Sequence, residues 1–167
     1  MDDVLAKAEE WRAAGETVAL ATVVATRRSA PRPIGSKLAV TSTGRMFGSV
    51  SGGCVEADVA ERAKAILAGE PSAVVTYGIA DDEAWSVGLP CGGEIDVFVE
   101  PFTGAPPIER GTSYVVVAGQ GLGERWHDDR FDRTELREEE GRSVFAEGIA
   151  PPQRLIAVGA GDIAEAL

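Results

Sequence analysis

An unbroken stretch of small and β-branched residues near the N-terminus, Thr17–Thr26 (TVALATVVAT), predicts a strand buried inside a sheet. Shorter apolar runs, separated by glycine and proline, supply further strands. These strands are predicted at 37–41 and 45–50, joined by a hairpin turn at 42–44, and at 73–79, 94–100 and 114–118. Strict alternation in 94–100 (EIDVFVE) predicts one buried side and one solvent-facing side.

Two helices are predicted beside these strands. The first is capped by Asp3 and stops at Gly15, and the second opens at Ser51–Cys54 and stops at Gly69. Together the elements predict an α+β fold, a mixed sheet with flanking helices. The polar stretch that leads up to Arg142 contains no predicted element.

The pair Pro151–Pro152 predicts a domain boundary, with one domain at 1–150 and a linker plus the start of another at 151–167. The second part has the pattern of a truncated Rossmann-type start, because a strand leads into Gly159-x-Gly161-x-x-Ala. Gly159 and Gly161 would bind NAD(P) only in an intact C-terminal domain. This chain ends before the acidic ribose-binding residue of that fold, which predicts a fragment or a truncated product.

Charge is distributed unevenly along the chain. The net charge of −11 argues against general nucleic-acid binding. Segment 17–55 nevertheless holds five basic residues and no acidic one: Arg27, Arg28, Arg32, Lys37 and Arg45. This basic island predicts a small anion held at one place, and the alternative is a basic strand edge that guards against aggregation.

A glycine loop precedes the second predicted helix, in Gly48–Glu56 (GSVSGGCVE). Glycines let the backbone approach a ligand closely, and the free amides of a helix start suit an anion. We therefore expect Ser51, Gly52 and Gly53 to bind a ligand, and Cys54 at the helix N-terminus to be stabilised as a thiolate. The alternative is a tight turn with a buried cysteine.

The only other cysteine, Cys91, lies in a second glycine loop, Gly88–Gly93 (GLPCGG), where Gly92 and Gly93 again expose backbone amides. If both loops lie at one edge of the sheet, Cys54 and Cys91 face a common pocket. The alternatives are a disulfide or two unrelated core cysteines.

A third loop, 29–37 (SAPRPIGSK), is stiffened by prolines and presents Arg32 and Lys37 to a phosphate. It is not a P-loop, because Ala30 stands where that motif requires a glycine and the strand-loop-helix context is missing.

Segments 21–37, 48–56 and 88–100 together resemble the signature blocks of the XdhC/CoxI proteins, accessory proteins of xanthine dehydrogenase and carbon monoxide dehydrogenase. Residues 151–167 resemble the start of that family's Rossmann domain, although Asp162 stands where many relatives have histidine. The resemblance implies a protein that binds the molybdenum cofactor (molybdopterin), protects it during sulfuration and helps insert it into a hydroxylase. It makes Cys54 and Cys91 the expected metal-contacting thiols, and thiolates suit thiophilic molybdenum.

We therefore expect domain 1–150 to be a molybdenum cofactor chaperone rather than an enzyme. The expected partners are a molybdenum hydroxylase apoenzyme and a cysteine desulfurase, with self-association through strand edges. Neither nucleic acid nor a membrane span is expected, and the missing apolar leader predicts a cytoplasmic location. Two alternatives stay open, an NAD(P)-dependent oxidoreductase fragment and a non-catalytic interaction module whose glycine loops are only turns.

Overall fold

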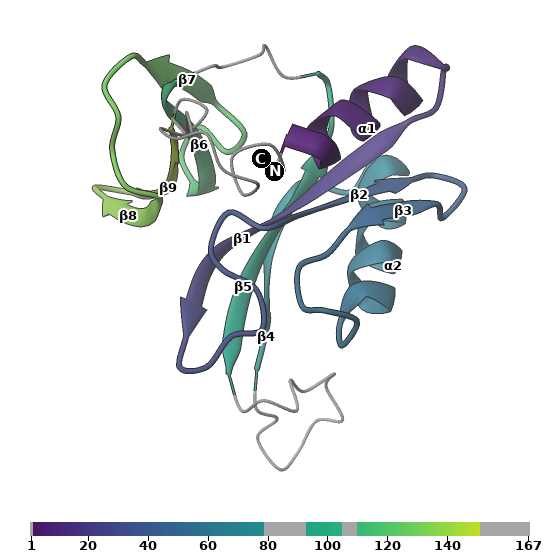
Figure 1. Cartoon of the computed structure of the whole chain (residues 1–167), viewed down its shortest axis with the longest axis horizontal. Helices are drawn as coiled ribbons and strands as arrows, with labels where there is room; N and C mark the ends of the chain where they lie inside the picture. The colour runs from purple at the N-terminus through teal and green to yellow at the C-terminus, as the bar shows by residue number, and fades with distance from the viewer. Residues whose placement is uncertain (1, 79–92, 105–109, 151–167) are drawn as a thin grey trace, which may run out of the picture.

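The computed structural model describes residues 2–78, 93–104 and 110–150. Within these ranges the chain forms two helices and two β-sheets (Figure 1), which confirms the predicted α+β class. All strand pairs in both sheets are antiparallel, so the predicted mixed sheet is wrong. The predicted Rossmann-type start lies outside the described residues. Neither described helix has the length and apolar character needed to cross a membrane.

The larger sheet has five strands in the order β3-β2-β1-β5-β4. They are β1 (Val18–Arg27), β2 (Lys37–Thr41), β3 (Met46–Gly48), β4 (Ala73–Tyr77) and β5 (Glu94–Pro101). The connections between β1, β2 and β3 are too short for a crossover helix, so these strands must run antiparallel. The predicted buried strand is confirmed, since β1 lies at the centre and is buried continuously from Val18 to Val24.

One face of this sheet is covered by α2 (Glu56–Leu67). The apolar cluster that they share includes Val59, Ala63 and Ile66 of the helix and Val23 and Val97 of the sheet. The helix begins later than predicted, because Val55 is its N-cap and residues 51–54 form a loop before it. Gly69 follows the last turn with a φ of +116°, a backbone conformation that favours glycine.

The opposite face of the larger sheet is shared between α1 (Asp2–Ala13) and the second sheet. Ala8 and Trp11 of α1 pack against Val18 and Ala39 of the larger sheet. The helix therefore buries the apolar stripe that the sequence predicts, and it starts one residue before the predicted cap.

The second sheet has four strands in the order β7-β6-β9-β8. They are β6 (Gly111–Gly119), β7 (Arg125–Asp128), β8 (Glu135–Glu139) and β9 (Arg142–Ile149). Only β6 was predicted. The strands β7 and β8 could not be predicted, because their side chains are mostly charged and at most partly buried. No alternation of apolar and polar residues marks these two segments.

Apolar contacts join the two sheets. The shared cluster contains Val24 and Phe98 of the larger sheet and Val115, Val117 and Phe145 of the smaller one. The second sheet therefore covers the side of β5 that was predicted to face solvent, and that prediction is wrong: β5 is buried on both sides.

Two ion pairs also cross between the sheets. Lys37 donates to both carboxylate oxygens of Glu147, at 2.7 and 2.9 Å, and Arg125 pairs with Glu100. Burial raises the pKa of Glu100, although Arg125 and Lys37 oppose this rise. Charges buried at a junction must be paired, so these contacts fix how the sheets meet.

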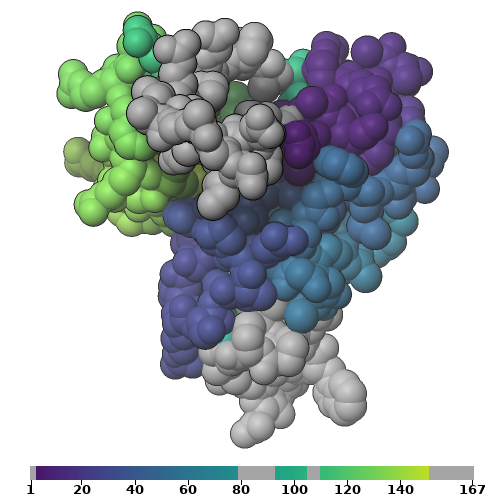
Figure 2. Space-filling model, in the orientation of Figure 1, coloured from purple at the N-terminus to yellow at the C-terminus, as the bar shows by residue number. Residues whose placement is uncertain are grey.

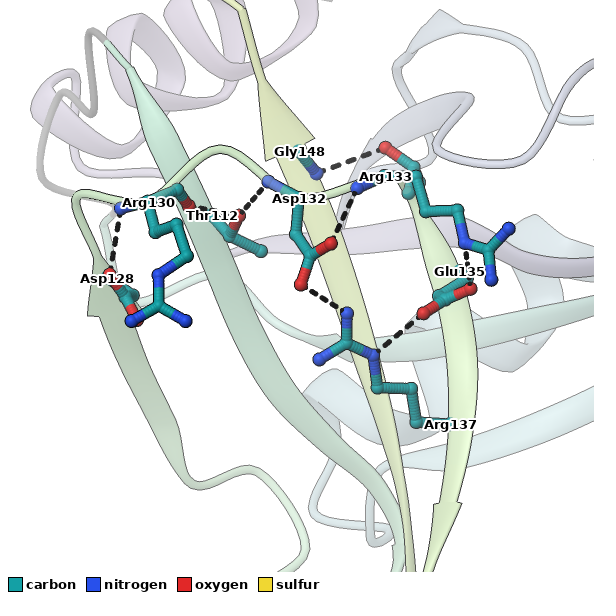
Figure 3. A network of polar contacts seen from close by, with 9 residues as sticks. Thr112, Asp128, Arg130, Asp132, Arg133, Glu135, Arg137 and Gly148 are labelled. Carbon is teal, nitrogen blue, oxygen red and sulfur yellow. Dashed lines mark hydrogen bonds and ion pairs between the residues drawn. The ribbon is translucent and has the colours of Figure 1, made fainter.

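A polar network holds the loop between β7 and β8 (Figure 3). Thr112 donates to the carbonyl of Arg130 at 2.8 Å and accepts from the amide of Asp132 at 2.9 Å. The Gly148 amide donates to the Thr134 hydroxyl at 3.1 Å. Thr134 in turn lies beside Gly35, where an added Cβ would stand 3.7 Å from its methyl group. The second sheet thus borders the loop that carries Arg32.

Candidate functional site

The strands β1 and β4 end at the same end of the larger sheet (Figure 1). Arg27 at the end of β1 pairs with Glu94 at the start of β5, and Tyr77 at the end of β4 pairs with Ile95. On the other side of β1, Leu38 near the start of β2 pairs with Gly48 at the end of β3. The loops that follow β1 and β4 therefore begin at the same end of the sheet. The loop after β3 begins further back, level with Ala21 of β1, and it reaches this end at α2, where Asp58 accepts a hydrogen bond from the Tyr77 hydroxyl at 2.6 Å.

Direct packing brings parts of the three sequence motifs together. A Cβ at Gly93 would lie 2.1 Å from the carbonyl oxygen of Ser29, so the end of the third motif touches the loop after β1. Cys54 and Ala30 both pack against the cluster between α2 and the sheet. Cys91 and Gly92 lie outside the described residues, so a common pocket for the two thiols stays a prediction.

The loop before α2 is organised around the side chain of Glu56. This carboxylate accepts hydrogen bonds from the amides of Val50, Ser51, Gly52, Gly53 and Val55, at 2.8 to 3.2 Å. It also accepts from the hydroxyls of Ser49 and Ser51. The sequence predicted that these amides bind an external anion or stabilise the Cys54 thiolate. In the structure they donate their hydrogen bonds to the chain's own Glu56 carboxylate.

Burial alone would raise the pKa of Glu56, but hydrogen bonds from Ser51, Ser49 and the loop amides outweigh burial and lower it to about 2. The carboxylate is therefore ionised throughout the physiological range. Cys54 lies two residues before it, outside the helix, as a partly buried free thiol.

The structure corrects the prediction of one basic island. Arg27 donates to Asp96 at 2.8 Å and also pairs with Glu94. Arg45 pairs with Glu16 at 2.5 Å. Lys37, whose side chain is only 4% exposed, is committed to Glu147. Three of the five cations are thus neutralised by carboxylates from other parts of the chain.

Arg28 and Arg32 are the island's remaining cations, and neither forms an ion pair with a residue that the structure describes. Both are exposed, in the loop between β1 and β2. Arg28 has a φ of +59°, the only non-glycine residue in the left-handed region among the described residues. Such backbone strain clusters at functional sites. These two guanidinium groups are the ones available to an anion.

A surface hollow of about 500 Å³ borders this loop. It is lined by Val4, Arg32, Pro33, Ile34, Gly35, Ser36, Lys37, Gly48 and Ser49. In Figure 2 violet and blue atoms of the N-terminal part border the green second sheet from below, and purple α1 lies above them on the other side. Arg32 is the exposed cation of this lining, and a guanidinium group suits an anionic partner.

Sequence reasoning missed two carboxylates that shape the site. Glu56 had a usable signal, because an acidic residue at the start of a helix often satisfies the free amides of the preceding loop. Glu147 had none, since it lies 110 residues from Lys37 in β9, a strand that was not predicted. Gly159 and Gly161 fall outside the described residues.

Two loops of the candidate site carry a thiol, at Cys54, and exposed guanidinium groups, at Arg28 and Arg32. Glycines beside the thiol leave space, since a Cβ at Gly52 or Gly53 would meet nothing within 4 Å. Among the described residues, no three His, Cys, Asp or Glu side chains lie close enough together to hold a metal ion. A thiol suits a thiophilic metal, and a guanidinium group suits an anionic group.

Comparison with known proteins points to one group. Residues 11–78 match the XdhC and CoxI family. The chain is 35% identical over 106 residues to the molybdenum cofactor insertion chaperone PaoD of Escherichia coli (strain K12), covering 63% of this chain and 33% of that protein. It is 38% identical over 90 residues to a probable xanthine dehydrogenase subunit of Bacillus subtilis (strain 168), covering 53% of this chain and 27% of that protein. The chain thus spans about a third of the length of these relatives.

The fold also resembles a solved structure. The crystal structure of a xanthine dehydrogenase from Bacillus halodurans matches with a TM-score of 0.58 and 18% identity, covering 87% of this chain and 52% of that chain. At that identity the likeness shows a shared fold alone. The aligned share is too large to lie in the larger sheet only, so the second sheet belongs to the common fold.

Proposed function

We propose that this chain, whose residues 11–78 match the XdhC and CoxI family, handles the molybdenum cofactor as an insertion chaperone. The cofactor is its cargo, which the chain binds, protects and passes to a xanthine dehydrogenase-type or carbon monoxide dehydrogenase-type hydroxylase. The relative from Escherichia coli is named for the same task.

The observation that carries this proposal is the convergence of the three motifs at one end of the larger sheet. Cys54 packs against the same apolar cluster as Ala30, and the exposed guanidinium of Arg32 lies two residues after Ala30 in the loop that follows β1. The segment that contains Cys91 begins after β4 and ends at Gly93, which touches the loop after β1. A thiophilic metal and an anionic pterin tail need these two kinds of group side by side.

We assign the thiols of Cys54 and Cys91 to the molybdenum and Arg32 to the phosphate of the pterin. The glycines at 52, 53, 92 and 93 would provide the space beside the thiols, and Ser51 shapes the loop through its bonds to Glu56. Lys37 would act indirectly, because its pair with Glu147 holds the start of β2 next to the Arg32 loop.

The proposal extends to the whole protein. Residues 1–150 would form the cofactor-handling unit, and residues 151–167 would begin a nucleotide-binding unit at Gly159 and Gly161. The molybdenum hydroxylase apoenzyme would receive the cargo, and a cysteine desulfurase would supply sulfur to it while it is bound. A reducing cytoplasm would keep Cys54 as the free thiol that the structure shows.

Purification of the chain from cells that make the cofactor tests the proposal. We expect molybdenum and pterin fluorescence to co-purify with it and to activate an apo-hydroxylase on mixing. Arg32→Ala should reduce the bound pterin by about tenfold, as expected for a lost charge-assisted contact of ~1.4 kcal/mol. Arg110→Ala, which removes an exposed arginine just before β6, serves as the control.

A wild-type chain that carries neither molybdenum nor pterin would contradict the proposal. Saturable binding of NAD(P) by this chain would instead favour an oxidoreductase fragment. Thiols that stay inert in the folded protein, together with the absence of pterin, would favour an interaction module.

A further inference from the structure

Glu56 is the side chain around which the candidate site is built. Seven hydrogen bonds from the loop end on its two carboxylate oxygens, five from amides and two from hydroxyls. Two further bonds tighten the same loop: the Gly52 amide donates to the Ser49 hydroxyl at 2.8 Å, and the Val55 amide donates to the Ser51 hydroxyl at 3.0 Å.

These contacts hold the chain on both sides of Cys54. The amides of Gly53 and Val55, its immediate neighbours, both donate to Glu56, at 2.8 and 3.2 Å. Cys54 itself gives no hydrogen bond to this carboxylate, and its thiol remains partly exposed. Gly52 and Gly53 adopt φ values of +81° and +112°, so the loop turns sharply just before the thiol.

We propose that Glu56 is a positioning residue for the Cys54 thiol. Its carboxylate accepts hydrogen bonds along the loop from Ser49 to Val55 and so fixes the position of the sulfur. A partly buried carboxylate that accepts many amide bonds leaves few alternative loop conformations, because each alternative would strand several donors without a partner.

The arrangement also selects where the cargo's anionic group can bind. The loop amides already donate to Glu56, so a phosphate would meet a negative charge there. Arg28 and Arg32 offer it exposed guanidinium groups instead, and neither forms an ion pair with a described residue. This part of the inference rests on the proposed function, whereas the positioning of the thiol does not. The two parts therefore need separate measurements.

The first measurement is the rate at which iodoacetamide alkylates Cys54, in a Cys91→Ala background where Cys54 is the only thiol. We expect Glu56→Gln to raise this rate by about tenfold, since the neutral amide cannot hold all seven donors and the loop opens more often. Glu56→Asp, which is one methylene shorter, should give an intermediate rate. The matched control is Glu61→Gln, a 73% exposed carboxylate of the same helix, which should leave the rate unchanged.

An unchanged alkylation rate in Glu56→Gln, or an equal rise in Glu61→Gln, overturns the inference. Thermal melting of each variant shows whether it is folded at the assay temperature. If Glu56→Gln does not fold, the Glu56→Asp rate decides the question by the same criterion.

The second measurement separates positioning from general stability through cofactor retention per folded chain. If Glu56 acts through the thiol, Glu56→Gln lowers retention in the wild-type background but causes no further loss in Cys54→Ala. An additive loss in the double variant contradicts this coupling. A wild-type chain that retains no cofactor contradicts the proposed function instead. In that case the alkylation rates alone test whether Glu56 positions the Cys54 thiol.

Discussion

At the scale of single residues, the structure shows that the charge of Glu56 satisfies a group of backbone donors. The sequence motif was predicted to offer these amides to an outside anion. The chain supplies the anion itself, from the first residue of α2. Three basic side chains are likewise neutralised within the chain, each by a carboxylate distant in sequence: those of Arg27, Lys37 and Arg45. Charge counted along a sequence does not reveal such pairs.

The depressed pKa of Glu56 predicts a pH-dependent stability. A carboxyl whose pKa is lowered from 4.5 to about 2 stabilises the fold fully above pH 4.5, and this contribution is lost as the pH falls toward 2. Glu56→Gln should therefore lower the free energy of unfolding by about 2 kcal/mol at pH 7, allowing for partial solvent screening. Urea titrations between pH 3 and 7 measure this. The deficit should shrink below pH 4.5, and a deficit that stays constant would contradict the account.

At the scale of helices and strands, the sequence predicts those elements that a local pattern of apolar residues marks. The two helices, β1, β2, β4 and β5 were all predicted close to their observed positions, because unbroken apolar runs and helical spacing mark them. The strands β7, β8 and β9 were not predicted, since their short, charged segments become strands only through pairing with β6 and each other. The convergence of the motifs at one end of the sheet likewise depends on strand order, which no local pattern encodes.

The contact between Gly93 and the loop after β1 is a test at this scale. A Cβ at position 93 would stand 2.1 Å from the Ser29 carbonyl oxygen, so backbone must move to admit it. Gly93→Ala should lower the free energy of unfolding by about 3 kcal/mol, as overpacking does. Gly141→Ala is the control, because its Cβ would meet nothing within 4 Å and only its φ of +80° opposes the change, at about 1 kcal/mol. Urea unfolding compares them, and an equal loss would contradict the contact.

At the scale of the whole molecule, the second sheet buries charged groups of the first. Lys37 and Glu147, with side chains 4% and 12% exposed, form the central pair of that junction. Their position next to Gly35 links the docking of the sheets to the loop that carries Arg32. The second sheet, formed by residues 111–149, therefore supports the loop that carries Arg32, although it contributes no residue of the three motifs.

Removing one partner of this pair should cost more than removing both. Lys37→Met leaves the Glu147 carboxylate buried without its cation, at a cost of about 3 kcal/mol in unfolding free energy. The double variant with Glu147→Met should recover most of that loss, because two apolar side chains can then pack together. Chemical denaturation of the two variants provides the comparison. A double variant no more stable than Lys37→Met would show that the pair does not govern the junction.

We propose that the thiols of Cys54 and Cys91 hold the molybdenum cofactor. The most direct test of this proposal is the molybdenum content per chain, by elemental analysis, of Cys54→Ala and Cys91→Ala purified in parallel with the wild type from cofactor-producing cells. We expect both variants to lose molybdenum and Cys54→Ala to lose more, since the bonds from Gly53 and Val55 to Glu56 hold the chain on both sides of Cys54. Full and equal molybdenum retention in both variants would contradict it.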